Sequence, residues 1–406
     1  MEIGRESRIS FLDNLKLFLS ITVIAHHAGQ PYGGSEGWWY VKDSVQPVDL
    51  GPFFGVNAAF NMSLYFLISA FFIPLSFDKK GASGFLKERL KRLGIPLLFG
   101  FFVLIPVMMY TYYLNYRNYA PISFGNYYLN VYFGFGEKPE SWTGPSWPDL
   151  NFGHLWFIQH LLIYSLLYIL WKVTFKTEKT KKKTFNITVT YSKIVLFTSI
   201  IATLTFVTRI WYPIDHWIGF LGFIQMEVAH FPQYLSFFFL GIIASQTGLI
   251  QSIPSYLGRT SLGIGIGLVL LIYLGIIPSS KGGFTGVALF YAFYETTLCL
   301  SLVVGLISLF MRTLNVSTAF SRKLAANTYA VYIIHVPVLV ALQYAFLKIN
   351  IPGYVKFPLI TLLGIFLCNV LSHFVVRKFS YLSIVVSGSS NKTVSRNEQL
   401  SQVDDL

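Results

Sequence analysis

Charged residues are scarce in this chain. Asp, Glu, Lys and Arg together make up 12% of its 406 residues, whereas hydrophobic residues make up 54%. Soluble domains contain roughly 25% charged residues, so this chain cannot cover a globule of its size with an ionic surface. The composition therefore excludes an ordinary water-soluble fold and predicts an integral membrane protein.

Cysteine is nearly absent as well. The two cysteines, Cys299 and Cys368, both lie inside apolar segments, which argues against a disulfide framework. The N-terminal residues 1–14 are polar and charged, and no small-residue cleavage site follows the first apolar run. The sequence thus predicts that this first apolar segment remains in the mature protein.

Several motifs of well-known enzyme classes are also missing. The sequence has no Walker A loop, GxSxG elbow, HExxH pair or CxxC pair, and no spacing typical of metal ligands. We therefore expect no bound metal. A net charge of +13 would suggest a nucleic-acid partner in a soluble protein. In a membrane protein, basic residues instead set orientation and contact anionic lipids, so we expect membrane lipids and no nucleic acid as partners.

What the chain does contain is a series of apolar segments, most of them near the length of about 20 residues needed to cross a bilayer. They predict an all-α polytopic membrane protein with about ten transmembrane helices, formed by residues 1–386, and a polar, disordered tail at 387–406. The sixth segment is short and needs upstream residues such as Phe231 to span. The predicted segments are 15–29, 53–77, 93–114, 154–172, 194–212, 234–245, 261–277, 285–311, 324–347 and 355–376.

The distribution of Lys and Arg predicts the orientation of these segments. With the N-terminus in the cytoplasm, 24 of the 31 basic residues fall in cytoplasmic segments and 7 in outer ones. Cytoplasmic loops of membrane proteins carry this excess, so both termini are expected inside. The basic run at 176–183 is then a solvated cytoplasmic loop or a partner site. The outer loop at 115–153 contains Trp142 and Trp147, which suits either sugar stacking or an interfacial aromatic belt.

Ionisable residues inside the predicted spans are candidates for function, because burying them in lipid is costly. Lys16 and His27 are eleven residues apart in the first span, which places them on one helical face about 16 Å apart. A neutral imidazole in an apolar site can act as a general base. Glu295 has a similar predicted depth and needs a buried partner. We expect it to pair with His27 and support its imidazolium, with His335 as a second candidate partner.

Arg89 and Arg92 form a basic pair immediately before the predicted third span. Their spacing of three residues places both guanidinium groups on one helical face. A pair of this kind at a helix N-terminus is suited to binding phosphates, and it is equally suited to contacting lipid headgroups.

The residues at Lys16, His27, Arg89 and Arg92, together with several longer stretches, resemble the membrane acyltransferase family 3, close to the branch of glucan-modifying succinyltransferases. The opening stretch RISFLDNLKLFLSITVIAHHAGQPYGG carries the family pattern of a basic residue, ten residues and then His, at Lys16 and His27. Lys16 stands where the family has Arg. The family's RxxR motif matches Arg89 and Arg92. Further matching stretches are LYFLISAFF from Leu64, GHLWFIQHLLIY from Gly153, HFPQYLSFFFLG from His230 and NTYAVYIIHVPVL from Asn327.

The resemblance implies an O-acyltransferase of the cell membrane. It would move an acyl group, acetyl or succinyl, from cytoplasmic acyl-coenzyme A to a hydroxyl of a cell-surface or lipid-linked glycan. His27 would then be catalytic with Glu295 in support, and Lys16, Arg89 and Arg92 would bind the donor. The alternative from another class is a proton-coupled transporter or glycan flippase, in which the same buried residues relay protons. No inverted repeat and no paired broken helices support that alternative.

Overall fold

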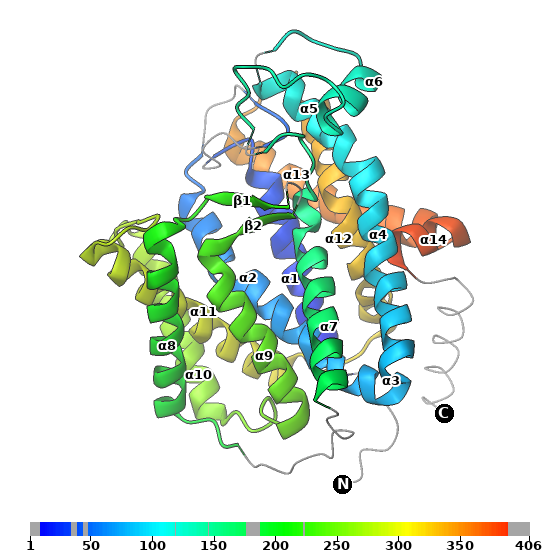
Figure 1. Ribbon diagram of the computed structural model, residues 1–406. Helices are drawn as coiled ribbons and strands as arrows, with labels where there is room; N and C mark the ends of the chain where they lie inside the picture. The colour runs from blue at the N-terminus through cyan, green and yellow to red at the C-terminus, as the bar shows by residue number, and fades with distance from the viewer. Residues whose placement is uncertain are drawn as a thin grey trace.

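The computed structural model describes residues 9–33, 39–43, 48–117, 119–144, 146–175, 187–221 and 224–388. This part of the chain is a bundle of long helices packed side by side (Figure 1). The lysine-rich run at 176–183 lies outside the described residues, as does nearly all of the predicted polar tail. The main bundle helices are α1 (Ser10–Gly29), α2 (Gly51–Phe71), α7 (Trp156–Thr174), α8 (Tyr191–Trp211), α9 (Phe231–Thr247), α10 (Ser255–Tyr273), α11 (Gly286–Thr313), α12 (Ala319–Phe346) and α13 (Gly353–Leu371).

The spans of the structure correspond to those predicted from the sequence, except the first. In the described part, nine helical segments are long and apolar enough to cross a membrane, and they correspond to the second through tenth predicted segments. The first predicted segment corresponds to α1, which contains too many polar residues to count among these nine apolar segments. Because α1 packs against α2, α11, α12 and α13, most of its surface faces other helices instead of lipid. The all-α, multi-pass membrane architecture is thereby confirmed.

The third span is longer than predicted and less regular. The helical segment Ile73–Tyr116 has 44 residues, but it breaks at Gly81, whose φ of 68° is not helical, and two π-helical stretches interrupt the α-helix beyond that point. Each stretch ends shortly before a proline, Pro96 or Pro106. A proline ring clashes with the carbonyl four residues earlier, and a widened turn relieves that clash. The segment comprises α3 (Ile73–Arg89), η1 (Leu90–Gly94), α4 (Ile95–Phe99), η2 (Gly100–Leu104) and α5 (Ile105–Tyr116).

A short antiparallel hairpin was not predicted. β1 (Trp217–Phe220) pairs with β2 (Ile224–Glu227), with Trp217 opposite Glu227 and Phe220 opposite Ile224. The hairpin joins α8 to α9 through η5 (Val228–His230) and lies across the bundle at the end of these helices (Figure 1). Upstream residues do complete the short sixth span, as expected, because α9 begins at Phe231.

The loop between α5 and α7 folds back on the bundle as an aromatic cap (Figure 1). It contains α6 (Phe124–Asn126), η3 (Tyr127–Tyr132) and η4 (Gly153–Leu155). Arg117 and Asp149 form a buried ion pair at 2.7 Å inside the cap, and the Tyr127 hydroxyl donates to the same carboxylate at 2.9 Å. Burial raises the pKa of Asp149, an effect that Arg117 and Tyr127 partly oppose.

The two tryptophans of this cap pack against other parts of it. The Arg117 guanidinium lies 3.7 Å from the centroid of the Trp142 ring, and the Trp142 and Trp147 rings meet edge to face at 4.8 Å. Much of the aromatic surface therefore shapes the cap itself. Sugar stacking by these rings stays a prediction.

Candidate active site

His27 lies in the last turn of α1, where three parts of the chain meet. Its ring stacks on Trp39 with centroids 5.3 Å apart and an angle of 12°. The ring of His335 in α12 is 5.1 Å away, and that of the neighbouring His26 is 5.4 Å away. The His27 Nδ1 atom is buried and has no hydrogen-bond partner among the described residues. This nitrogen is therefore available to a reacting group.

A fully buried glutamine holds His27 and Trp39 in this arrangement. The Trp39 Nε1–H donates to the side-chain oxygen of Gln343 at 2.8 Å. The Gln343 amide nitrogen donates in turn to the carbonyls of His27 and Ala28, at 3.2 Å and 3.3 Å. One side chain of α12 thus fixes both the end of α1 and the indole that covers the imidazole. Sequence reasoning missed Gln343, although a single amide in an apolar span is a recognisable signal.

A buried ion pair anchors the segment that carries Trp39. Lys356, at the start of α13, lies 2.7 Å from Asp43, and both side chains are almost fully buried. The charge count placed Lys356 among the seven outer basic residues, whereas the structure turns its side chain into the protein. Because Asp43 is only four residues from Trp39, this pair restrains the position of the ring that stacks on His27.

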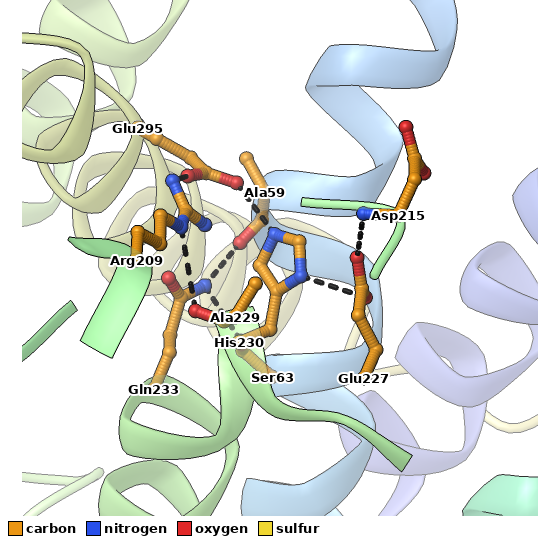
Figure 2. Close-up of polar contacts among 9 residues, drawn as sticks. All are labelled: Ala59, Ser63, Arg209, Asp215, Glu227, Ala229, His230, Gln233 and Glu295. Carbon is orange, nitrogen blue, oxygen red and sulfur yellow. Dashed lines mark hydrogen bonds and ion pairs between the residues drawn. The ribbon is translucent and has the colours of Figure 1, made fainter. Parts of the chain in front are cut away.

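Glu295 does not pair with His27, so that prediction is wrong. The carboxylate of Glu295, in α11, forms an ion pair with Arg209 of α8 and contacts His230 Nε2 at 2.9 Å. His230 Nδ1 contacts Glu227 at 2.8 Å, so His230 lies between two carboxylates (Figure 2). Among the described residues, none of the polar contacts of Glu295 is with His27.

The reason for this error is the assignment of Arg209. It was counted with the outer basic residues although it falls inside the predicted segment 194–212, and α8 places its side chain inside the bundle, 2% exposed. The arginine also donates through Nε to the carbonyl of Ala229 at 3.3 Å, next to His230 (Figure 2). The buried Glu295 carboxylate does have a charged partner, as expected, but that partner is Arg209 of α8 instead of His27 of α1.

The predicted donor-binding residues are found far along the bundle from His27. Lys16 is eleven residues before His27 on α1, and its ammonium lies 4.6 Å from the Phe72 ring and 3.5 Å from Asp13. Arg89 is buried against the ring of Phe85 at 4.5 Å. These contacts place Lys16 near the junction of α2 and α3, and Arg89 at the end of α3.

Arg92 lies in η1, directly after α3. Its position shows that the predicted location of the basic pair was wrong. Its guanidinium lies 5.9 Å from the Tyr329 ring of α12, and the Tyr329 hydroxyl donates to the Arg92 carbonyl at 2.6 Å. Arg89 and Arg92 were predicted at a helix N-terminus. They lie instead within a continuous helical segment, after a kink at Gly81, which has φ of 68°. The helix dipole therefore does not contribute to anion binding at this pair.

A packing gap that is too narrow to admit a water molecule lies next to His335. It is bounded by α1, α2 and α12, and the Tyr65 hydroxyl and Ser20 hydroxyl are hydrogen-bonded at 2.9 Å on its wall. Tyr65 also donates to the Lys16 carbonyl at 3.4 Å, which ties the gap to the level of Lys16. The lining residues are Ser20, Val23, Ile24, Tyr65, Val331, Tyr332 and His335.

The histidine side chains of the site are suited to proton transfer. Histidines at hydrogen-bonding distance of a substrate can take and return protons near neutral pH, and the apolar surroundings exclude competing water. Among the described residues, no group of three or more His, Cys, Asp and Glu side chains is arranged to hold a metal ion.

Comparison with known proteins identifies the family of the chain. Residues 9–374 match the family model described as an acyltransferase domain. The chain is 25% identical over 350 residues to glucans biosynthesis protein C of Escherichia coli strain SMS-3-5, covering 80% of this chain and 81% of that protein. It is 24% identical over 344 residues to the protein of the same name from Salmonella heidelberg, with the same coverage. No solved structure matches the chain. Because the family match spans nearly all of the bundle, the chain belongs to this acyltransferase family and is a multi-pass membrane acyltransferase.

Proposed function

We propose that this acyltransferase moves an acetyl or succinyl group from cytoplasmic acyl-coenzyme A to a carbohydrate hydroxyl on the outer side of the membrane. The observation that carries the proposal is the buried, unpartnered Nδ1 of His27, whose ring stacks on Trp39 and lies beside His335, a residue that lines the narrow gap. The carbohydrate acceptor is supported by the relatives, which are named for glucan biosynthesis.

The orientation in this proposal follows from the charge distribution. The end of the bundle that carries Lys16, Arg89 and Arg92 faces the cytoplasm, and both termini lie on that side. His27 then lies toward the outer half of the membrane, stacked on Trp39, which belongs to the same buried cluster as Tyr127 and Tyr132 of the aromatic cap. The nucleotide of the donor binds at the basic end, and its thioester reaches inward between α1, α2 and α12. The acceptor sugar enters from the capped side.

In the transfer step, His27 acts as the general base. A ring nitrogen takes the proton of the sugar hydroxyl while the hydroxyl oxygen forms a bond to the thioester carbonyl carbon. The carbon–sulfur bond then breaks, and the coenzyme A sulfur takes up the proton that His27 removed from the sugar, so the imidazole returns to its neutral form. Trp39 and Gln343 keep the imidazole in place throughout. In a direct transfer of this kind, no acyl group is attached to the enzyme.

The basic pair should bind the phosphates of the donor. Replacing the exposed Arg92 by alanine is expected to raise the KM for acyl-coenzyme A about tenfold, because one charge-assisted contact contributes about 1.5 kcal/mol. The KM for the glycan should stay unchanged. Initial rates at varied donor and acceptor concentrations give both constants.

The neighbouring Lys91 provides the matched control for Arg92. It is also exposed and basic, and it lies one residue away on the same π-helical turn. Lys91→Ala should therefore leave the donor KM near that of the wild type. An equal increase in both variants would point to general charge attraction, and no increase in either would contradict a phosphate site at this pair.

The proposal as a whole is tested with the full chain in nanodiscs. Acetyl- or succinyl-coenzyme A and a purified glucan are added, and free thiol and acylated sugar are followed by absorbance and mass spectrometry. Stoichiometric thiol and acyl-sugar formation is the expected result. Glucan movement across proteoliposomes without acylation would support a transporter instead, and would overturn the proposal.

A further inference from the structure

His27 is the first of three buried imidazoles that form a row through the protein. The His335 ring lies 5.1 Å from that of His27, and the His154 ring of η4 lies 5.2 Å from that of His335, edge on to it. His335 is 1% exposed and His154 is 8% exposed. Three imidazoles in this arrangement, inside a membrane protein, are costly to keep unless the chemistry uses them.

Backbone carbonyls fix the tautomers of the second and third imidazoles. His335 Nδ1 lies 2.6 Å from the carbonyl of Tyr332, and His154 Nε2 lies 2.9 Å from that of Ile333. A carbonyl only accepts, so each of these nitrogens carries the ring proton. In the neutral rings, His335 Nε2 and His154 Nδ1 therefore carry free lone pairs. Both atoms are buried and have no hydrogen-bond partner among the described residues.

The imidazoles of His27 and His335 face different sides of the site. His27 stacks on Trp39 and lies beneath the aromatic cap, on the acceptor side of the proposed reaction. His335 lines the narrow gap between α1, α2 and α12, along which the proposed donor would reach inward. The lone pair of His335 Nε2 is thus located between the general base and the position that the proposed thioester would occupy.

We infer that His335 is a second catalytic residue, which carries the proton from the acceptor side to the donor side. This inference rests on the proposed function. The sugar hydroxyl gives its proton to His27 as its oxygen bonds to the acyl carbon, and His27 passes a proton to His335 Nε2. As the carbon–sulfur bond breaks, His335 gives this proton to the coenzyme A sulfur, which leaves as the thiol. Both histidines end the cycle neutral.

Two conservative variants separate this function from a structural one. In His335→Asn, the side-chain amide replaces Nδ1–H and can keep the hydrogen bond to the Tyr332 carbonyl, but nothing replaces Nε2. In His335→Gln, the longer side chain places an amide near the position of Nε2, where it forms hydrogen bonds but transfers no proton. A residue that only holds α12 in place would tolerate the asparagine.

We expect both variants to lower kcat on the order of 100-fold, the usual size of a proton-transfer contribution, with donor and glycan KM unchanged within about twofold. Size-exclusion profiles and thermal midpoints matching the wild type show that the variants fold. A His335→Asn enzyme with wild-type kcat would overturn the inference, as would a loss confined to either KM. If the wild-type enzyme releases no thiol and acylates no glucan, the proposed function itself fails, so the two failures are distinguishable.

Discussion

Replacing His27 by alanine is expected to lower kcat for acyl transfer by about 10²- to 10⁴-fold, the range that a positioned general base contributes. The protein should remain folded, because Gln343 bonds to the backbone carbonyls of His27 and Ala28 and not to the imidazole. Thiol release and acylated glucan, measured at saturating donor, report the effect. The KM values should change little, since the side chain contributes mainly after both substrates are bound.

A second histidine at a distance from the site provides the control for this variant. His373, in η6 (Ser372–Val376), is half-buried and packs on the neighbouring Phe374 ring at 4.8 Å. His373→Ala removes the same chemical group from a helix of the same bundle and should leave kcat near the wild-type value. A His27→Ala enzyme with the kcat of the His373→Ala enzyme would exclude His27 as the base.

The same preparation separates direct transfer from a covalent acyl-histidine. Wild-type enzyme is mixed with the acyl-coenzyme A donor alone, quenched and analysed by intact mass spectrometry. Direct transfer predicts no added acyl mass and no burst of thiol before the glucan is supplied. A stoichiometric burst, absent in His27→Ala, would replace the base mechanism by a double displacement through His27.

The spans were predictable from the sequence because one physical quantity, the thickness of the bilayer, sets their length. The depth of His27 and of Glu295 along their helices follows from the rise per residue and needs no tertiary information. The third span departs from the prediction at Pro96 and Pro106, where proline changes the helix geometry.

The partners of the buried charges were not predictable in the same way. Depth along a helix does not determine which neighbours a side chain faces, because this depends on how the helices pack around one another. Glu295 of α11 faces α8 and the start of α9, where Arg209 and His230 lie. A count of basic residues on each side also treats Arg209 as solvated, since it cannot detect that a side chain near the end of a span turns into the bundle.

Glu295 should contribute to stability more than to chemistry. Replacing it by alanine leaves Arg209 and His230 inside the bundle without the carboxylate that they share. Breaking a buried ion pair from one side costs about 3–5 kcal/mol, because the remaining charge is uncompensated. We therefore expect a large drop in the thermal midpoint of Glu295→Ala in detergent. The folded fraction, measured at low temperature, should keep a kcat near the wild-type value.

Two further variants show whether this loss comes from the uncompensated charge. Glu140 is an exposed carboxylate of the aromatic cap, and Glu140→Ala should leave the midpoint unchanged, since exposed charges contribute little. Adding Arg209→Met to Glu295→Ala removes the orphaned guanidinium, and it should recover part of the lost stability because an apolar side chain needs no counter-charge. A midpoint for Glu295→Ala equal to that of Glu140→Ala would contradict the ion-pair argument. A normal midpoint combined with a lost kcat would instead return Glu295 to a catalytic function, acting on His27 through a rearrangement of the bundle.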